Sequence, residues 1–267
     1  MIVGICGLGF VGNAVNTFFE NRFYQTIIYD KYKEINSFEM LIDTNVLFIC
    51  LPTNYSEELG TYDMREIDST LAMLYKKDYR GIIVIKSTVL PGYCHSMNEK
   101  YRDLAILANP EFLSAKTAVY DFENQKHIVL GYTKHSKEAT RTIEYVYRDI
   151  FGAIVITVVD ADEAALIKLG CNSFYAMKIQ YFTELYMLCD KLGVSYEKVK
   201  NGMLENGWIN KNHTEVPGSD GEVSYGGMCL PKDIKALSGY MSGKNVENGV
   251  LESVIEEREI LRGKNKM

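Results

Sequence analysis

The first 160 residues alternate between short apolar runs and stretches in which apolar residues recur every three or four positions. The apolar runs predict strands at 2–6, 26–29, 46–51, 82–85, 104–108, 127–130 and 154–159. The periodic stretches predict helices at 13–21, 63–76, 91–101 and 136–148. This alternation favours a parallel sheet covered by helices on both faces, so residues 1–160 are expected to form a doubly wound, Rossmann-type α/β domain.

The pattern changes after residue 160. Residues 161–192 predict one long helix that is apolar on most of its surface. Shorter helices are predicted at 196–204, from 233 to 239 and at 250–262, with a loop over 207–225 and a frayed tail over 263–267. Residues 161–267 are therefore expected to form a smaller, all-helical domain. A helix this apolar is either the spine of a core or a subunit interface, and we expect a homodimer formed through it.

A glycine-rich turn joins the first predicted strand to the first predicted helix. Its spacing, Gly7-x-Gly9-x-x-Gly12, is the dinucleotide fingerprint in its proper context. Asp30 ends the next strand, where a carboxylate accepts the ribose hydroxyls and repels a 2′-phosphate, which favours NAD over NADP. The residues expected to contact NAD here are Gly7, Gly9, Phe10, Val11, Gly12 and Asp30. The alternative is a βα turn that binds nothing.

Three polar residues follow predicted strands of the first domain, namely Thr53, Thr88 and Glu111. Ligands of doubly wound proteins bind beyond the carboxyl ends of the strands, so these side chains are expected to face one crevice. Taken singly, each also fits a turn-capping role.

Bulk properties exclude several classes of protein. The chain has 267 residues and a net charge of −6, which argues against a nucleic-acid binder. No apolar run reaches the roughly 18 residues of a membrane span, and the N-terminus does not read as a signal peptide. The six cysteines form no CxxC pair, so they are expected to be reduced thiols of a cytoplasmic protein. The four histidines have no ligand-like spacing, and no metal site is expected.

Two further features carry candidate chemistry. Lys168 and Asn172 lie at i and i+4 of the long predicted helix, on one face and among small or apolar residues. The stretch 226–233, GGMCLPKD, places Cys229 after two glycines and close to Lys232 and Asp233. A thiol near a cation ionises more readily, and the thiolate is the nucleophile. A glycine turn with a buried, inert cysteine is the alternative.

Taken together, these motifs resemble the UDP-glucose/GDP-mannose dehydrogenase family, and they follow the family order along nearly the whole chain. The matching segments are GLGFVG at 7–12, STV at 87–89 with Pro91-Gly92, NPEFL at 109–113, YDF at 120–122, then Glu163, Lys168, Asn172, Glu184 and GGMCLPKD at 226–233. The resemblance implies oxidation of a sugar primary alcohol, such as that of UDP-glucose, to the carboxylate by NAD in two hydride transfers.

The resemblance also assigns roles. Cys229 would form a thiohemiacetal and then a thioester, with Lys168 and Asn172 stabilising the oxyanion. Asp233 would assist proton transfer, and Glu111 with Thr88 would position the hydrolytic water. Further cofactor contacts are implied for Thr53, Thr88 and Lys232. Substrate contacts are implied for Glu111, Phe112, Leu113, Lys168, Asn172, Tyr225 and Gly226.

The sequence departs from the family pattern in two places. Family members carry a third, C-terminal α/β domain over the substrate nucleotide, and the chain is expected to be a short form without it. Ser114-Ala115-Lys116 stands where the family has an acid and a glycine near the substrate. A different or smaller alcohol, a wall supplied by a partner chain, and weak affinity for the nucleotide sugar all fit these departures.

Two other functions fit the same sequence. A two-electron enzyme like the β-hydroxyacid dehydrogenases shares the nucleotide domain and a lysine–asparagine pair, but it does not need the cysteine. A non-catalytic NAD-binding protein would keep the fold alone. The number of NADH molecules formed per substrate separates the two enzymes.

Overall fold

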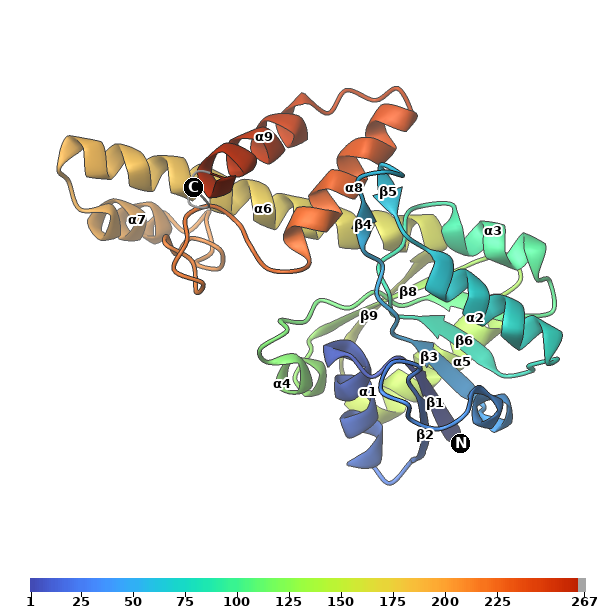
Figure 1. Cartoon of the computed structure of the whole chain (residues 1–267). Coiled ribbons are helices and arrows are strands. Elements are labelled where there is room, and N and C mark those ends of the chain that lie inside the picture. Colours follow the sequence, from blue (N-terminus) through green and yellow to red (C-terminus); the bar gives the residue numbers. More distant parts are fainter. Residues whose placement is uncertain (264–267) are drawn as a thin grey trace. The chain divides into compact units, whose positions relative to one another are not determined.

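The computed structural model describes residues 1–263 in two compact units. The first unit contains residues 1–54 and 62–168, and the second contains 55–61 with the rest of the chain from 169. Figure 1 shows the order of their elements along the chain. Most of the frayed tail expected over 263–267 lies outside the described residues. Within residues 1–263 we find no helix with the length and apolar character needed to cross a bilayer.

The first unit is built on a seven-stranded sheet with the order β2-β1-β3-β6-β7-β8-β9. The strands are β1 (Ile2–Cys6), β2 (Gln25–Tyr29), β3 (Val46–Ile49), β6 (Ile82–Ile85), β7 (Ala105–Ala108), β8 (His127–Tyr132) and β9 (Val155–Asp160). Neighbouring strands are parallel, as predicted, except that β7 and β8 are antiparallel where Ala108 faces Gly131. The sequence did not indicate this reversal. The direction of β8 depends on whether the chain re-enters the sheet at the carboxyl or the amino end of β7, and no local pattern specifies that.

Helices cover both faces of this sheet. One face is packed by α1 (Phe10–Glu20), α4 (Ala118–Glu123) and α5 (Lys137–Phe151). The other is packed by α2 (Arg65–Lys76), α3 (Tyr93–Lys100), the 3-10 helix η1 (Phe38–Asp43) and the first turn of α6 (Ala161–Leu192). Successive residues of β3 point to opposite faces, with Phe48 in one core and Ile49 in the other. The doubly wound architecture is therefore confirmed.

The strand order reverses between β1 and β3, because the chain leaves β1 toward β2 on one side and continues to β3 on the other. In such sheets the carboxyl ends of the two strands splay apart at this point and leave room for a ligand. Gly7 follows β1 at this position, and Cys50 follows β3.

The second unit is helical. It contains α6 from residue 169, α7 (Tyr196–Glu205), α8 (Leu230–Gly243) and α9 (Gly249–Gly263). It also takes in most of a hairpin, β4 (Tyr55–Ser56) and β5 (Thr61–Tyr62), which the sequence analysis missed. The hairpin is held to α8 by an ion pair of 2.8 Å between Lys235 Nζ and Glu57 Oε1.

The long helix has the predicted bounds, 161–192. The predicted start of α8 at residue 233 was three residues late, because the helix begins at Leu230 and includes Pro231 in its first turn. A proline is accepted in the first turn of a helix, where its missing N–H has no partner to lose. Cys229 is consequently the N-cap residue of α8.

Candidate functional site

The glycine turn after β1 has the geometry of a dinucleotide cradle. Gly7 has a positive φ of +92°, and Gly9 is the N-cap of α1, which begins at Phe10 and Val11. A Cβ on Gly12 would lie 1.9 Å from the Gly7 carbonyl oxygen, so Gly12 lets α1 pack against the turn. A Cβ on Gly9 would meet nothing within 4 Å, which leaves open space beside the positive end of α1. These residues fit a bound pyrophosphate.

Asp30 directly follows β2, and its carboxylate is hydrogen-bonded to the glycine turn after β1. Its Oδ2 accepts the Leu8 N–H at 2.7 Å, and its Oδ1 accepts the N–H groups of Tyr32 and Lys33 at 3.0 and 2.9 Å. Burial would raise the pKa of Asp30, but these three donors outweigh it and hold the pKa below its usual value. The carboxylate is therefore charged and fixed beside the glycine turn, as an acceptor for ribose hydroxyls must be.

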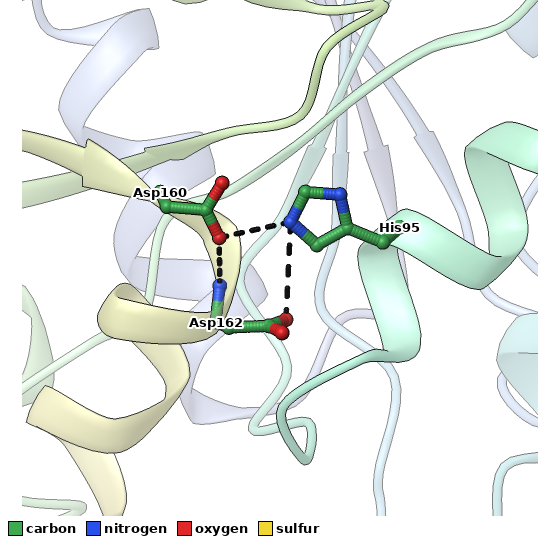
Figure 2. Close-up of side chains that lie close together, drawn as sticks. All are labelled: His95, Asp160 and Asp162. Carbon is green, nitrogen blue, oxygen red and sulfur yellow. Dashed lines mark hydrogen bonds and ion pairs between the residues drawn. The ribbon is translucent and has the colours of Figure 1, made fainter.

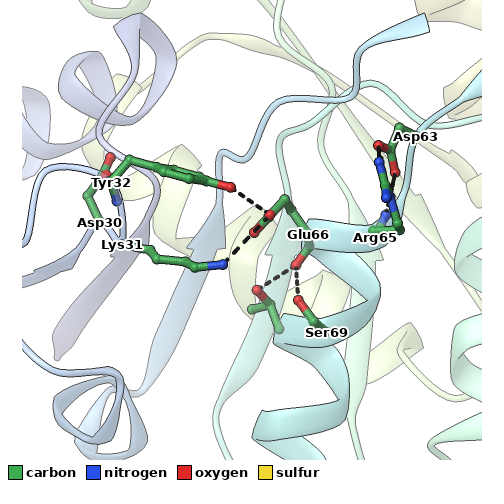
Figure 3. Close-up of polar contacts among 8 residues, drawn as sticks. Asp30, Lys31, Tyr32, Asp63, Arg65, Glu66 and Ser69 are labelled. Atoms are coloured by element: carbon green, nitrogen blue, oxygen red, sulfur yellow. Dashed lines mark hydrogen bonds and ion pairs between the residues drawn. The ribbon is translucent and has the colours of Figure 1, made fainter. Parts of the chain in front are cut away.

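The segment after Asp30 is fastened to the first turn of α2. Tyr32 Oη donates to Glu66 Oε1 at 2.8 Å, and Lys31 Nζ lies 3.9 Å from the same oxygen (Figure 3). Asp63 and Arg65 form a separate surface pair one turn away. These contacts fix the path of the chain that leaves Asp30.

Asp30→Asn is expected to relax the choice between NAD and NADP, because it removes the charge that repels a 2′-phosphate and keeps an acceptor oxygen. The ratio of the NADP and NAD dissociation constants should fall by about 10-fold or more. Fluorescence titration of both cofactors measures this ratio, with Asp149→Asn as the matched control on an exposed aspartate. An unchanged ratio in Asp30→Asn would contradict the assigned role.

A buried ion pair lies in the first unit. Lys168 Nζ is 3.1 Å from Glu111 Oε1, and the two side chains are only 4% and 6% exposed. Glu111 Oε2 accepts the Leu113 N–H at 2.6 Å, and the ammonium lies 5.3 Å from the centre of the half-exposed Phe112 ring. Two residues chosen from separate sequence motifs, 57 positions apart, thus meet directly.

Lys86 is a buried cation that the sequence analysis did not select. It follows β6 directly, and its Nζ donates to Asn109 Oδ1 at 3.2 Å. Burial lowers the pKa of Lys86 to about 8, against the opposing effect of Glu111. The same Asn109 oxygen accepts the hydroxyl of Tyr147 at 2.6 Å. The available signal was its place directly after an apolar strand, at the sheet edge where ligands of doubly wound proteins bind.

Thr53 and Thr88 also meet in the first unit. Thr53 Oγ1 donates to the Thr88 carbonyl oxygen at 2.8 Å, and both residues are buried. The ends of β3 and β6 are therefore joined by the two threonines that the sequence analysis expected to face one crevice.

In the second unit, polar side chains of α6 and α8 are in contact with one another. Asn172 Nδ2 donates to Asp233 Oδ2 at 2.6 Å, and Asp233 is fully buried. Lys232 Nζ lies 2.6 Å from the other oxygen, Asp233 Oδ1. The Asp233 N–H donates to the Cys229 carbonyl oxygen at 3.0 Å, in the first turn of α8. Cys229 is partly exposed, at the helix end whose dipole favours an anion.

Tyr225 and Gly226, both expected to contact the substrate, differ in accessibility. The Tyr225 side chain is 1% exposed and packs with Ala176, Ile234 and Leu251 in a hydrophobic cluster. Its ring is therefore turned into the core of the second unit. Gly226 is half-buried, and the chain passes through it toward Cys229.

His95, Asp160 and Asp162 form the one group of three within residues 1–263 whose ligand atoms, within 4.8 Å of one another, could hold a metal ion (Figure 2). His95 Nε2 is hydrogen-bonded to Asp160 Oδ1 at 2.8 Å, and Asp162 Oδ1 accepts the Gly92 N–H at 2.6 Å. The Asp162 N–H donates to Asp160 Oδ1 at 3.0 Å. Each carboxylate already accepts a hydrogen bond from a donor. These bonds join α3 and the residue before it to the end of β9 and the start of α6.

Comparison with protein families matches both parts of the chain to one family. Residues 29–151 match the NAD-binding domain of the UDP-glucose/GDP-mannose dehydrogenase family, and residues 162–259 match its central domain. The UDP-glucose 6-dehydrogenase of Rickettsia bellii is 32% identical over 249 residues, which cover 88% of this chain and 54% of that protein. The chain therefore spans about half the length of the curated relatives it matches.

Solved structures confirm the fold. A UDP-glucose dehydrogenase from Pyrobaculum islandicum superposes with a TM-score of 0.85 at 21% identity, covering 97% of this chain and 68% of that one. A 3-hydroxyisobutyrate dehydrogenase from Mycobacterium tuberculosis gives a TM-score of 0.74 at 14% identity, covering 96% of this chain and 91% of that one. Identities this low establish the shared fold alone.

Proposed function

Because the chain belongs to the UDP-glucose/GDP-mannose dehydrogenase family, we propose that it oxidises the primary alcohol of a nucleotide sugar to the carboxylate with NAD as the oxidant. The relative from Rickettsia bellii is a UDP-glucose 6-dehydrogenase, which makes UDP-glucose the first substrate to test. NAD, when bound, accepts one hydride in each of two oxidations. Each alcohol then consumes one water and two NAD⁺, and the products are one acid, two NADH and two protons.

The covalent steps fall to Cys229. Its thiolate adds to the carbonyl carbon of the aldehyde, which forms a C–S bond and, after protonation of the oxygen, a thiohemiacetal. Loss of hydride and of the hydroxyl proton converts this adduct into a thioester. Water then attacks the same carbon, the C–S bond breaks, and the thiolate is restored as the acid leaves. The thiohemiacetal keeps the carbon attached before the second oxidation, and the thioester that this oxidation produces is still hydrolysed by water.

The remaining residues act on charge and protons. Lys168 and Asn172 stabilise the oxyanion that develops on the substrate. Glu111 with Thr88 positions the hydrolytic water, and Asp233 holds a water or assists proton transfer. Thr53 and Lys232 complete the expected cofactor contacts, and Phe112 and Leu113 the substrate contacts.

One observation supports this assignment most strongly. The buried carboxylate of Asp233 receives the amide of Asn172 at 2.6 Å in the first turn of the helix that Cys229 caps. An amide and a carboxylate buried together at the first turn of the helix that Cys229 caps are consistent with polar chemistry at that helix end. Burial of unneeded polar groups costs stability.

The function is tested with the purified chain, NAD and a panel of nucleotide sugars and small alcohols, with products identified by mass. The proposal expects a uronic acid from a nucleotide sugar. One NADH per substrate with a ketone or aldehyde product would instead indicate a two-electron enzyme of the β-hydroxyacid dehydrogenase type. No NADH from any substrate would favour a non-catalytic NAD-binding protein.

We also propose a homodimer formed through α6. Phe174, Tyr181 and Leu188 stand seven residues apart on this helix and are 54%, 57% and 53% exposed. A spacing of seven keeps the three side chains on one stripe, which suits a second copy of the same helix. Light scattering should give a dimer mass for the wild type and for the exposed-residue control Tyr145→Glu. Tyr181→Glu should give a monomer, and a wild-type monomer would refute the proposal.

The six cysteines are free thiols, which supports the proposal that the protein works in the reducing cytoplasm. Cell fractionation of the tagged protein tests this assignment. Recovery outside the cytoplasmic fraction would overturn it.

A further inference from the structure

The loop that leads to Cys229 has little regular structure of its own. Between α7 and α8, the backbone bonds within 218–227 join Gly218 N to Glu222 O and Gly221 N to Gly218 O. The next residues include Ser224 with a φ of +62°, a conformation that is uncommon for non-glycine residues. The first turn of α8 holds the Cys229 carbonyl oxygen, whereas the path of the loop that leads to Cys229 depends on contacts from outside the loop.

Two arginines of α9 hold one side of the loop. Arg258 Nε donates to the Tyr225 carbonyl oxygen at 2.9 Å, and Arg262 Nη2 donates to the Ser224 carbonyl oxygen at 2.8 Å. Arg262 Nη1 also donates to Asp220 Oδ2 at 2.8 Å. The two arginine side chains are 18% and 17% exposed, so these bonds are largely shielded from water.

Side chains of α6 hold the other side. The Ser224 N–H donates to Thr183 Oγ1 at 3.0 Å, and the Ser224 hydroxyl donates to Gln180 Oε1. Thr183 and Gln180 are almost completely buried. Residues 224 and 225 are thus fixed between two helices, with the Tyr225 ring anchored in the core.

Gly226 shows how closely the arginine approaches the chain. A Cβ at this position would lie 2.6 Å from Asp220 Oδ2 and 2.8 Å from both terminal nitrogens of Arg262. The backbone runs directly against the Asp220–Arg262 pair, two residues before the peptide that joins Met228 to Cys229. A displacement of the pair therefore passes into the segment that carries the thiol.

We propose that Arg258 and Arg262 are positioning residues, which form with Asp220 a brace that sets the place of the Cys229 thiol. The expected effect on catalysis rests on the proposed function. The expected effect on the position of the loop rests on the hydrogen bonds alone. Covalent catalysis needs the nucleophile held within about 0.5 Å of its productive position. A guanidinium suits this task because its planar fork binds a carboxylate and a carbonyl at once, which an ammonium cannot do in the same geometry.

Arg262→Lys keeps the charge and removes the fork. We expect kcat for acid formation to fall by about 10- to 100-fold, because a displacement near 1 Å costs up to about 100-fold. The NAD dissociation constant and the melting temperature should stay at their wild-type values. Arg141→Lys is the matched control, since Arg141 forms an exposed pair with Glu138 on α5. Asp220→Asn should reproduce the loss, and the double variant should lose little more than either single variant.

The structural part of the proposal is tested without an activity assay. Amide hydrogen exchange of the peptide over 220–229 should accelerate by about 10-fold or more in Arg262→Lys and remain unchanged in Arg141→Lys. The rate of alkylation of Cys229 by iodoacetamide, followed by peptide mass, should change in the same variant. Altered exchange and alkylation in a protein with no dehydrogenase activity would support the brace and refute the proposed function. Unchanged exchange, alkylation and kcat would overturn the brace.

Discussion

Cys229→Ser is expected to lower the rate of acid formation by about 1000-fold or more, because an alkoxide leaves a carbonyl carbon far less readily than a thiolate. Loss of a covalent nucleophile typically costs at least this much. The variant should bind NAD as tightly as the wild type, since serine differs from cysteine only in the atom at the end of a small side chain and no cofactor contact is assigned to Cys229. Coupled mass analysis of the acid and titration of NAD measure the two properties separately.

Cys171→Ser is the matched control for this variant. Cys171 is also a free, partly exposed thiol of the second unit, but it belongs to α6 and no step is assigned to it. It should retain activity within about twofold of the wild type. Acid formation at the wild-type rate in Cys229→Ser would exclude the thioester route.

Gly12→Ala is expected to abolish the binding of NAD and to destabilise the first unit. The added Cβ would lie 1.9 Å from the carbonyl oxygen of Gly7, a backbone atom that cannot rotate away. Helix α1 would have to shift off the turn, at a cost of about 3 kcal/mol of unfolding free energy. Denaturant unfolding measures the loss of stability, and fluorescence titration should show at least about a 100-fold loss of NAD affinity.

Gly9→Ala is expected to weaken NAD binding without lowering the stability of the fold. A Cβ at Gly9 meets nothing within 4 Å, so the melting temperature should stay close to that of the wild type. The methyl group would still occupy the space beside the start of α1 where the pyrophosphate is expected. NAD affinity should therefore fall by at least about 10-fold. Wild-type affinity in this variant would place the pyrophosphate elsewhere.

The first unit was predictable from the sequence because its signals are local. The apolar runs, the glycine spacing and Asp30 all lie within short segments, and the parallel sheet with helices on both faces follows from their alternation. The bounds of α6 were predicted correctly for the same reason, since Gly193 takes a positive φ directly after the helix.

The contacts that the sequence did not indicate join residues far apart in the chain. The hairpin of β4 and β5 belongs to a helical unit that begins more than 100 residues later. His95 meets Asp160 across 65 positions, and Arg262 reaches Ser224 across 38. No periodicity encodes such pairs, because each depends on the packing of elements between them.

Within the candidate site, sequence motifs selected residues that the fold brings into contact, but not the contacts themselves. Glu111 and Lys168 were expected to serve different steps, and the structure pairs them as buried ions. Tyr225 was expected at the substrate, and its ring lies in the core. A motif identifies the residue type at a position. Which of its atoms can contact a ligand depends on burial in the folded chain.

The number of NADH molecules formed per molecule of nucleotide sugar consumed tests the central claim most directly. The purified chain is incubated with limiting nucleotide sugar and excess NAD, absorbance gives the NADH, and mass spectrometry gives the acid. The account predicts a ratio of two, with no free aldehyde accumulating, because the carbon stays attached to Cys229 between oxidations. A ratio of one, with an oxidised product that is not an acid, would contradict it.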